Sequence, residues 1–229
     1  MTMIHIENWM ELYSNTVRRV FRDRVIFIGL QGSYGRGEAN ENSDIDVVLI
    51  LDRVKLEDLK QYNSAIQSLS NREKICGFVS GVNEIAGWAK YDLFQFYHDT
   101  ISYHGNLDKM IPPIEHTDIR HAVLNGACNL YHMCSHNYLH SADMQALAGL
   151  YKAAVFTLQA KHYYETGSYI KQRTEMYDVL VDQDRRILQI SEQFKSGSFS
   201  EDQFEQFTDE MLNWTSGLIT TLSKYVLAN

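Results

Sequence analysis

The sequence of 229 residues contains only two prolines, three cysteines and no long apolar segment. Cys76, Cys128 and Cys134 are too few for a disulfide framework in a chain of this length, so a reducing cytoplasm is the expected location. No apolar run approaches the roughly 20 residues that span a bilayer, and residues 47–51 are among the longest. No membrane partner is therefore expected.

Basic residues are also in the minority. The chain has 21 Lys and Arg against 29 Asp and Glu, which gives a formal net charge of −8. Proteins that bind duplex nucleic acid usually carry a basic surface, so this partner is not expected. The acidic balance is compatible with a small cationic ligand.

The few prolines mark a change in the character of the sequence. Pro112 and Pro113 are adjacent and cannot lie inside a helix. Residues 1–111 hold eight of the thirteen glycines and several short β-like runs, whereas residues 117–228 read as long helical stretches. We therefore predict two domains, residues 1–111 and residues 112–229, with an α+β fold followed by helices.

In the first domain, apolar spacing and glycine positions predict an alternation of helices and strands. Four strands are expected, of which the last two lie within longer segments. The expected elements are a helix over 6–22, a strand over 25–30, a glycine-rich turn over 32–37, a strand over 43–51, a helix over 55–69, and strands within 74–80 and 91–97.

The chemistry is concentrated around the second predicted strand. Asp44 and Asp46 are two residues apart, so a strand directs both carboxylates to the same face. Two like charges on an otherwise apolar strand are costly unless a cation joins them. Mg²⁺ prefers oxygen ligands and is commonly shared between carboxylates and phosphates. Gly32 allows close approach of a phosphate, and Ser33 offers a hydroxyl and an N–H group.

Gly32-Ser33, followed by Asp44-Ile45-Asp46 on an apolar strand, resembles the motif of the DNA polymerase β-type nucleotidyltransferase superfamily. The resemblance implies that Gly32 and Ser33 hold the nucleotide phosphates and that both aspartates bind metal. Arg36 is a further candidate for a phosphate contact.

The family also uses a third carboxylate on a later strand. Asp92, in Tyr91-Asp92-Leu93, is preferred here, and Glu84 is the alternative. The resemblance implies that Asp44, Asp46 and Asp92 together hold two Mg²⁺ ions. Asp92 is also the one general base that we can propose.

The second half shows four helical patterns, over 117–138, 142–165, 170–195 and 201–227, which predict an up-and-down helical bundle. A nucleotidyltransferase domain followed by such a bundle resembles the antibiotic nucleotidyltransferases, particularly the aminoglycoside adenylyltransferases. The segment from Leu150 to Ala153 resembles the bundle helix whose lysine reaches the triphosphate, so Lys152 is a candidate nucleotide ligand.

The resulting hypothesis is a Mg²⁺-dependent enzyme that transfers AMP from ATP to a hydroxyl of a small acceptor, for example an aminoglycoside-like antibiotic. Two alternatives stay open: a protein-AMPylating enzyme of the antitoxin type, and a nucleotide-binding module without catalysis. The sequence defines neither the acceptor nor the oligomeric state.

Overall fold

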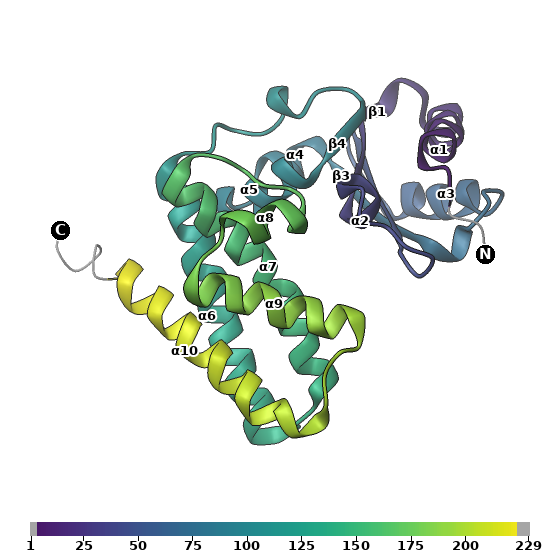
Figure 1. Cartoon of the computed structure of the whole chain (residues 1–229). Helices are drawn as coiled ribbons and strands as arrows, with labels where there is room; N and C mark the ends of the chain where they lie inside the picture. Colours follow the sequence, from purple (N-terminus) through teal and green to yellow (C-terminus); the bar gives the residue numbers. More distant parts are fainter. Residues whose placement is uncertain (1–3, 224–229) are drawn as a thin grey trace. The chain divides into compact units, whose positions relative to one another are not determined.

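The computed structural model describes residues 4–223 and divides the chain into two compact units, Met1–Pro113 and Ile114–Asn229 (Figure 1). The first unit is α+β and the second is a helical bundle, which confirms the predicted fold class. No helix among residues 4–223 is long and apolar enough to cross a membrane.

The first unit is built around a sheet of four strands in the order β3-β2-β1-β4. β1 is antiparallel to β2 and to β4, whereas β2 and β3 are parallel, so the sheet is mixed. Figure 1 shows α1 and α3 on one side of the sheet and α5 on the other. In chain order the elements are α1 (Ile6–Phe21), β1 (Val25–Gln31), α2 (Gly32–Arg36), β2 (Ile45–Leu51), α3 (Leu56–Ile66), β3 (Ile75–Gly81), α4 (Val82–Ala86), α5 (Lys90–Asp99) and β4 (Ile101–His104), with short 3₁₀ turns at Arg22–Arg24, Arg72–Lys74 and Leu107–Lys109.

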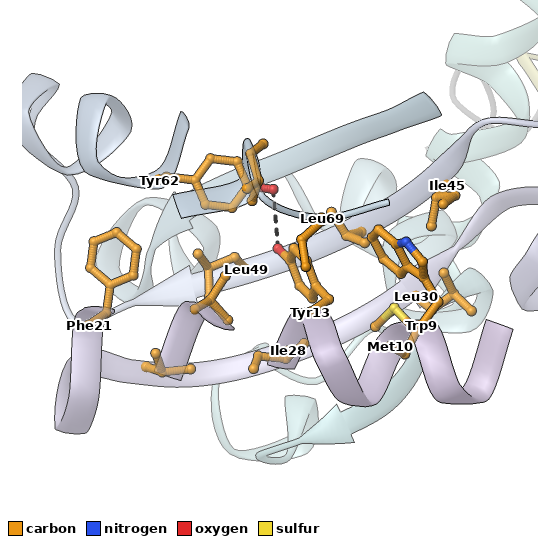
Figure 2. Packing of buried hydrophobic residues seen from close by; sticks show 14 of the residues in the cluster. Trp9, Met10, Tyr13, Phe21, Ile28, Leu30, Ile45, Leu49, Tyr62 and Leu69 are labelled. Carbon is orange, nitrogen blue, oxygen red and sulfur yellow. Dashed lines mark hydrogen bonds between the residues drawn. The ribbon is translucent and has the colours of Figure 1, made fainter. Parts of the chain in front are cut away.

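α1 packs on the sheet through an apolar stripe with helical spacing. Its buried apolar residues are Trp9, Met10, Tyr13, Val17 and Phe21. They meet side chains from β1 and β2, such as Ile28 and Leu49, and the Tyr13 and Tyr62 hydroxyls lie 3.2 Å apart (Figure 2). Because burying one large apolar side chain stabilises a fold by about 1.5–3 kcal/mol, this stripe is enough to fix α1 on one face of the sheet.

Arg24 forms a network of hydrogen bonds with carboxylates at one end of the β1–β2 pair. Arg24 donates to Asp52 at 2.9 Å and to both carboxylate oxygens of Asp58 at 2.6 and 3.2 Å. Asp58 is buried and also accepts the Lys55 backbone N–H at 2.9 Å. This end is where β1 begins and β2 finishes, so the start of β2 lies at the opposite end.

The second unit is a bundle in which α6 packs against α7 and α10, and α9 packs against α7 and α10. Tyr151 is fully buried and donates to the Phe207 carbonyl at 2.7 Å. Asp184 accepts from Lys161 at 2.5 Å and from the Trp214 indole at 2.7 Å. The helices are α6 (His116–His140), α7 (Met144–Thr166), α8 (Arg173–Val179), α9 (Asp182–Ser196) and α10 (Phe204–Ser223), with a 3₁₀ turn at Glu201–Gln203 before α10.

The strand predicted within 91–97 is wrong, because this segment lies inside helix α5. Leu93, Phe94 and Phe96 are buried, and an apolar run this short fits a strand or a buried helix equally well by its period. The strand follows the helix instead, as β4.

Two further expectations need correction. The helix predicted over 170–195 is interrupted, because Leu180 adopts an extended conformation between α8 and α9. The glycine-rich turn over 32–37 contains one helical turn, α2, which ends at Gly37 with φ +73°. Residues 224–227 of the last predicted helix lie outside the described residues.

Candidate active site

The start of β2 brings two carboxylates to one face of the sheet. Ile45 and Val47 are buried in the core beneath α1 and α3, so the alternation of a strand turns Asp46 to the other face. Asp44, just before the strand, is exposed, whereas Asp46 is half-buried. Burial raises the pKa of Asp46 above its ordinary value, and the neighbouring charge of Asp44 raises it further. A cation placed here would relieve both effects.

Gly32 packs directly against Asp46. Its φ is +67°, a conformation that favours glycine, and any Cβ at this position would overlap the Asp46 carboxylate and lie 2.6 Å from Asp46 Cγ. Gly32 begins α2 at the end of β1, where Gln31 pairs with Asp46, and Ser33 follows in the same turn. The structure therefore brings Gly32 and Asp46 into contact, with Ser33 next to them in the chain.

Arg36 is paired within the first unit. Its Nη1 donates to both carboxylate oxygens of Asp99 at 2.9 Å, and its Nε donates to Glu38 at 3.4 Å. Burial lowers the pKa of the guanidinium, but the charges of Asp99 and Glu38 more than offset this and raise it overall. The structure thus gives Arg36 protein partners and no support for the predicted phosphate contact.

Neither candidate for the third carboxylate lies on a strand. Asp92 is exposed in the first turn of α5, and Glu84 is exposed in α4. Within residues 4–223, no group of three His, Cys, Asp or Glu side chains is placed to hold a metal ion. The expectation that Asp92 lies on a strand is therefore wrong, because the segment is helical.

Two residues that sequence reasoning missed lie at the site. Cys76 on β3 is the register partner of Asp46, and its thiol hydrogen-bonds to the Asp46 carboxylate. Burial, and next the charge of Asp46, raise the pKa of this thiol. Asp99 ends α5 and accepts the Gly32 backbone N–H at 3.1 Å. In the sequence, the one local feature that could have drawn attention to Asp99 is the short β-like run 101–103 shortly after it.

Lys152 lies in the second unit, on the exposed face of α7. Its neighbours Tyr151 and Ala154 are fully buried. A lysine in this position keeps its ammonium group in water while its stem follows the helix.

Comparisons with known proteins agree with this fold. Residues 14–91 match the family model of the nucleotidyltransferase domain, which covers β1, Gly32, Ser33, Asp44 and Asp46. This part of the chain is a nucleotidyltransferase domain, and the chain is an enzyme of the nucleotidyltransferase class.

One solved structure with the same fold is spectinomycin adenyltransferase AAD(9) from Enterococcus faecialis, determined with ATP and spectinomycin. The TM-score is 0.59 at 12% sequence identity, and the match covers 93% of this chain and 99% of that one. The resemblance to antibiotic nucleotidyltransferases expected from the sequence is thereby confirmed at the level of the fold. No curated protein matches the sequence.

Proposed function

We propose that the protein transfers AMP from ATP to a hydroxyl group of a small acceptor. The observation that carries this proposal is the contact between Gly32 and Asp46, with Asp44 beside them, because it joins a phosphate-compatible glycine turn to a pair of carboxylates. The match of residues 14–91 to the nucleotidyltransferase domain supports the reaction class. The structural neighbour was solved with ATP, which supports ATP as the donor.

Asp44 and Asp46 fit Mg²⁺. Both are oxygen ligands, and Mg²⁺ is usually held by one or two carboxylates together with substrate phosphates. Their mutual repulsion and the burial of Asp46 are costs that a divalent cation offsets. When bound, Mg²⁺ would neutralise charge on the phosphates and on the leaving pyrophosphate. Gly32 and Ser33 would hold those phosphates close to the two carboxylates.

The sequence predicts two Mg²⁺ ions and a third acid, Asp92, as the base. The structure offers two neighbouring carboxylates, and the exposed position of Asp92 on α5 lends this part no support. Asp44 and Asp46 therefore carry the metal proposal, and the role of Asp92 stays a prediction.

Residues 1–111 are proposed as the catalytic domain and residues 112–229 as a C-terminal helical bundle domain. Lys152 on α7 is proposed to reach the triphosphate. An aminoglycoside-like antibiotic is the proposed acceptor, because the structural neighbour was solved with spectinomycin and because a net charge of −8 suits a cationic ligand. Antibiotic resistance would be the biological consequence.

A nucleotide-binding module without transfer is the second candidate. The observation in its favour is that β3, the strand next to β2, offers the thiol of Cys76 rather than a carboxylate opposite Asp46. A neutral thiol is a weak proton acceptor and a poor ligand for Mg²⁺. Such a site would bind Mg²⁺-ATP and release no pyrophosphate.

The deciding experiment measures binding of Mg²⁺-ATP by calorimetry and then pyrophosphate release with a panel of aminocyclitol and aminoglycoside antibiotics. Asp44→Asn should lower release by roughly 100-fold or more, because loss of a metal ligand removes several kcal/mol of charge stabilisation. Asp23→Asn is the matched control, since Asp23 is an exposed aspartate at the other end of β1.

Three outcomes separate the hypotheses. Release with a small acceptor that Asp44→Asn abolishes and Asp23→Asn preserves supports the transferase. Binding without release for any acceptor favours the module. Release only with a protein acceptor favours protein AMPylation, and full turnover by Asp44→Asn contradicts the proposed mechanism.

A further inference from the structure

Asp99 is a buried carboxylate that bonds to both ends of the helical turn α2. It is 6% exposed. Its Oδ2 accepts the Gly32 backbone N–H at 3.1 Å, and both of its oxygens accept from Arg36 Nη1 at 2.9 Å. Gly32 begins α2 and Arg36 ends it, so one carboxylate on α5 holds both ends of this helical turn.

The Asp99 carboxylate is tied to the glycine turn. Its two oxygens accept three hydrogen bonds, two from Arg36 and one from Gly32. The same bonds restrict Gly32, whose other side rests against the Asp46 carboxylate. Gly32 is therefore held between two carboxylates, one that Arg36 neutralises and one that faces Asp44.

We propose that Asp99 and Arg36 are positioning residues that hold the turn Gly32–Gly37 in the conformation that receives the nucleotide phosphates beside Asp46. The inference rests on the proposed function for its nucleotide, but the positioning itself is a property of the protein without ligand. Charge-assisted hydrogen bonds are stronger than neutral ones, and here one nitrogen of Arg36 holds both oxygens of Asp99. Buried residues that lock a binding group in this way determine how well it is pre-organised.

The chain contains a closely matched control. Asp58 has the same exposure of 6%, accepts hydrogen bonds from Nη1 and Nη2 of Arg24, and also accepts one from the backbone N–H of Lys55. It lies in the same unit at the opposite end of the β1–β2 pair. Asp99→Asn and Asp58→Asn each replace one buried, arginine-paired carboxylate by an amide, so both should lower the melting temperature of the protein.

The test compares these two variants by hydrogen exchange and by nucleotide binding. In Asp99→Asn, amides 32–37 should exchange about tenfold faster or more, the change expected from losing one hydrogen bond to a charged group. The Kd for Mg²⁺-ATP should rise by a similar factor. In Asp58→Asn, the exchange rate of amides 32–37 and the Kd for Mg²⁺-ATP should both stay within about twofold of wild type, because this substitution leaves the bonds of Asp99 intact.

A second variant keeps the proposal testable if Asp99→Asn fails to fold. Arg36→Lys keeps a cation beside Asp99 but loses the planar fork of the guanidinium. It should raise exchange of amides 32–37 in the same direction by a smaller factor. The double variant with Asp99→Asn should be no worse than Asp99→Asn alone, because the two residues act as one pair.

The positioning role is overturned if Asp99→Asn leaves exchange of amides 32–37 at the wild-type rate, or if Asp58→Asn accelerates it equally. With Asp99→Asn unfolded, wild-type exchange in Arg36→Lys overturns it as well. If wild-type protein binds no Mg²⁺-ATP, the proposed function fails, and the exchange comparison still decides whether Asp99 holds the turn.

Discussion

Replacing Gly32 by alanine tests the geometry of the candidate site most directly. A non-glycine residue at φ +67° is strained by roughly 1–2 kcal/mol, whatever space surrounds it. A methyl group at this position would also overlap the Asp46 carboxylate and lie 2.6 Å from its Cγ. The variant therefore suffers two separable effects, backbone strain and displacement of Asp46.

Gly37→Ala separates them, because Gly37 has φ +73° and no atom lies within 4 Å of where its Cβ would be. It carries the strain without the displacement. Asp46 is a side chain and can rotate, which costs about 0.5–1.5 kcal/mol when a rotamer is forced. We expect Gly37→Ala to lower the free energy of unfolding by about 1–2 kcal/mol, and Gly32→Ala by about 0.5–1.5 kcal/mol more.

The larger difference should appear in binding. Gly32→Ala moves a proposed metal ligand, so calorimetry should show a rise of at least about tenfold in the Kd for Mg²⁺-ATP, which corresponds to 1.4 kcal/mol. Gly37→Ala should bind like wild type. Urea unfolding provides the stability values for both variants. Equal binding of Mg²⁺-ATP by both variants and wild type would refute the placement of the nucleotide beside Gly32 and Asp46.

Three further predictions use the same assays. Lys152→Met should raise the Kd for ATP by about tenfold if the ammonium group contacts phosphate, with no change in melting temperature because Lys152 is exposed; an unchanged Kd would remove Lys152 from the site. Asp92→Asn should keep most of the pyrophosphate release that Asp44→Asn abolishes, because Asp92 is exposed on a helix; a loss equal to that of Asp44→Asn would restore it as the base. Because the pKa of Asp46 is raised, the folded protein holds the proton of the Asp46 carboxyl group more tightly than the unfolded chain does. The free energy of unfolding therefore falls as the pH rises from the ordinary aspartate pKa to the raised one. Asp46→Asn removes that penalty and should melt at a higher temperature than wild type at pH 7 without Mg²⁺, but not at a pH below the ordinary aspartate value; a lower melting temperature at pH 7 would contradict the pKa direction.

The sequence predicts the local elements of the site well where a single physical signal dominates. The apolar stripe of α1 has helical spacing, and the run that ends at Leu51 is apolar and rich in β-branched residues, which favours a buried strand. Both elements are found within one or two residues of their predicted bounds. The same strand draws attention to Asp44 and Asp46, because two charges on an apolar strand are costly unless a cation joins them.

The parts that the sequence does not predict depend on contacts between distant segments. The partner of Asp46 on β3 is Cys76, and nothing local specifies that register. Asp99 and Gly32 are 67 positions apart in the sequence. Asp99 ends a helix, α5, whose apolar pattern predicts a strand. For Asp92, the family resemblance predicts a carboxylate on a strand, whereas the structure places Asp92 at an exposed position of a helix.

The two ends of the β1–β2 pair differ in a way that supports placing the proposed site at the start of β2. At the far end, Asp58 is satisfied by Arg24 and a backbone N–H, and its pKa is lowered, with the Arg24 hydrogen bond as the largest cause. At the near end, Arg36 bonds to Asp99 and Glu38, and its charge lowers the pKa of Asp46 less than burial and Asp44 raise it. A direct arginine hydrogen bond of the kind that Asp58 accepts would lower the pKa of Asp46 further. A raised pKa at Asp46 lowers stability at one point of the sheet, and such local costs are typical of functional sites, in agreement with the proposed cation site.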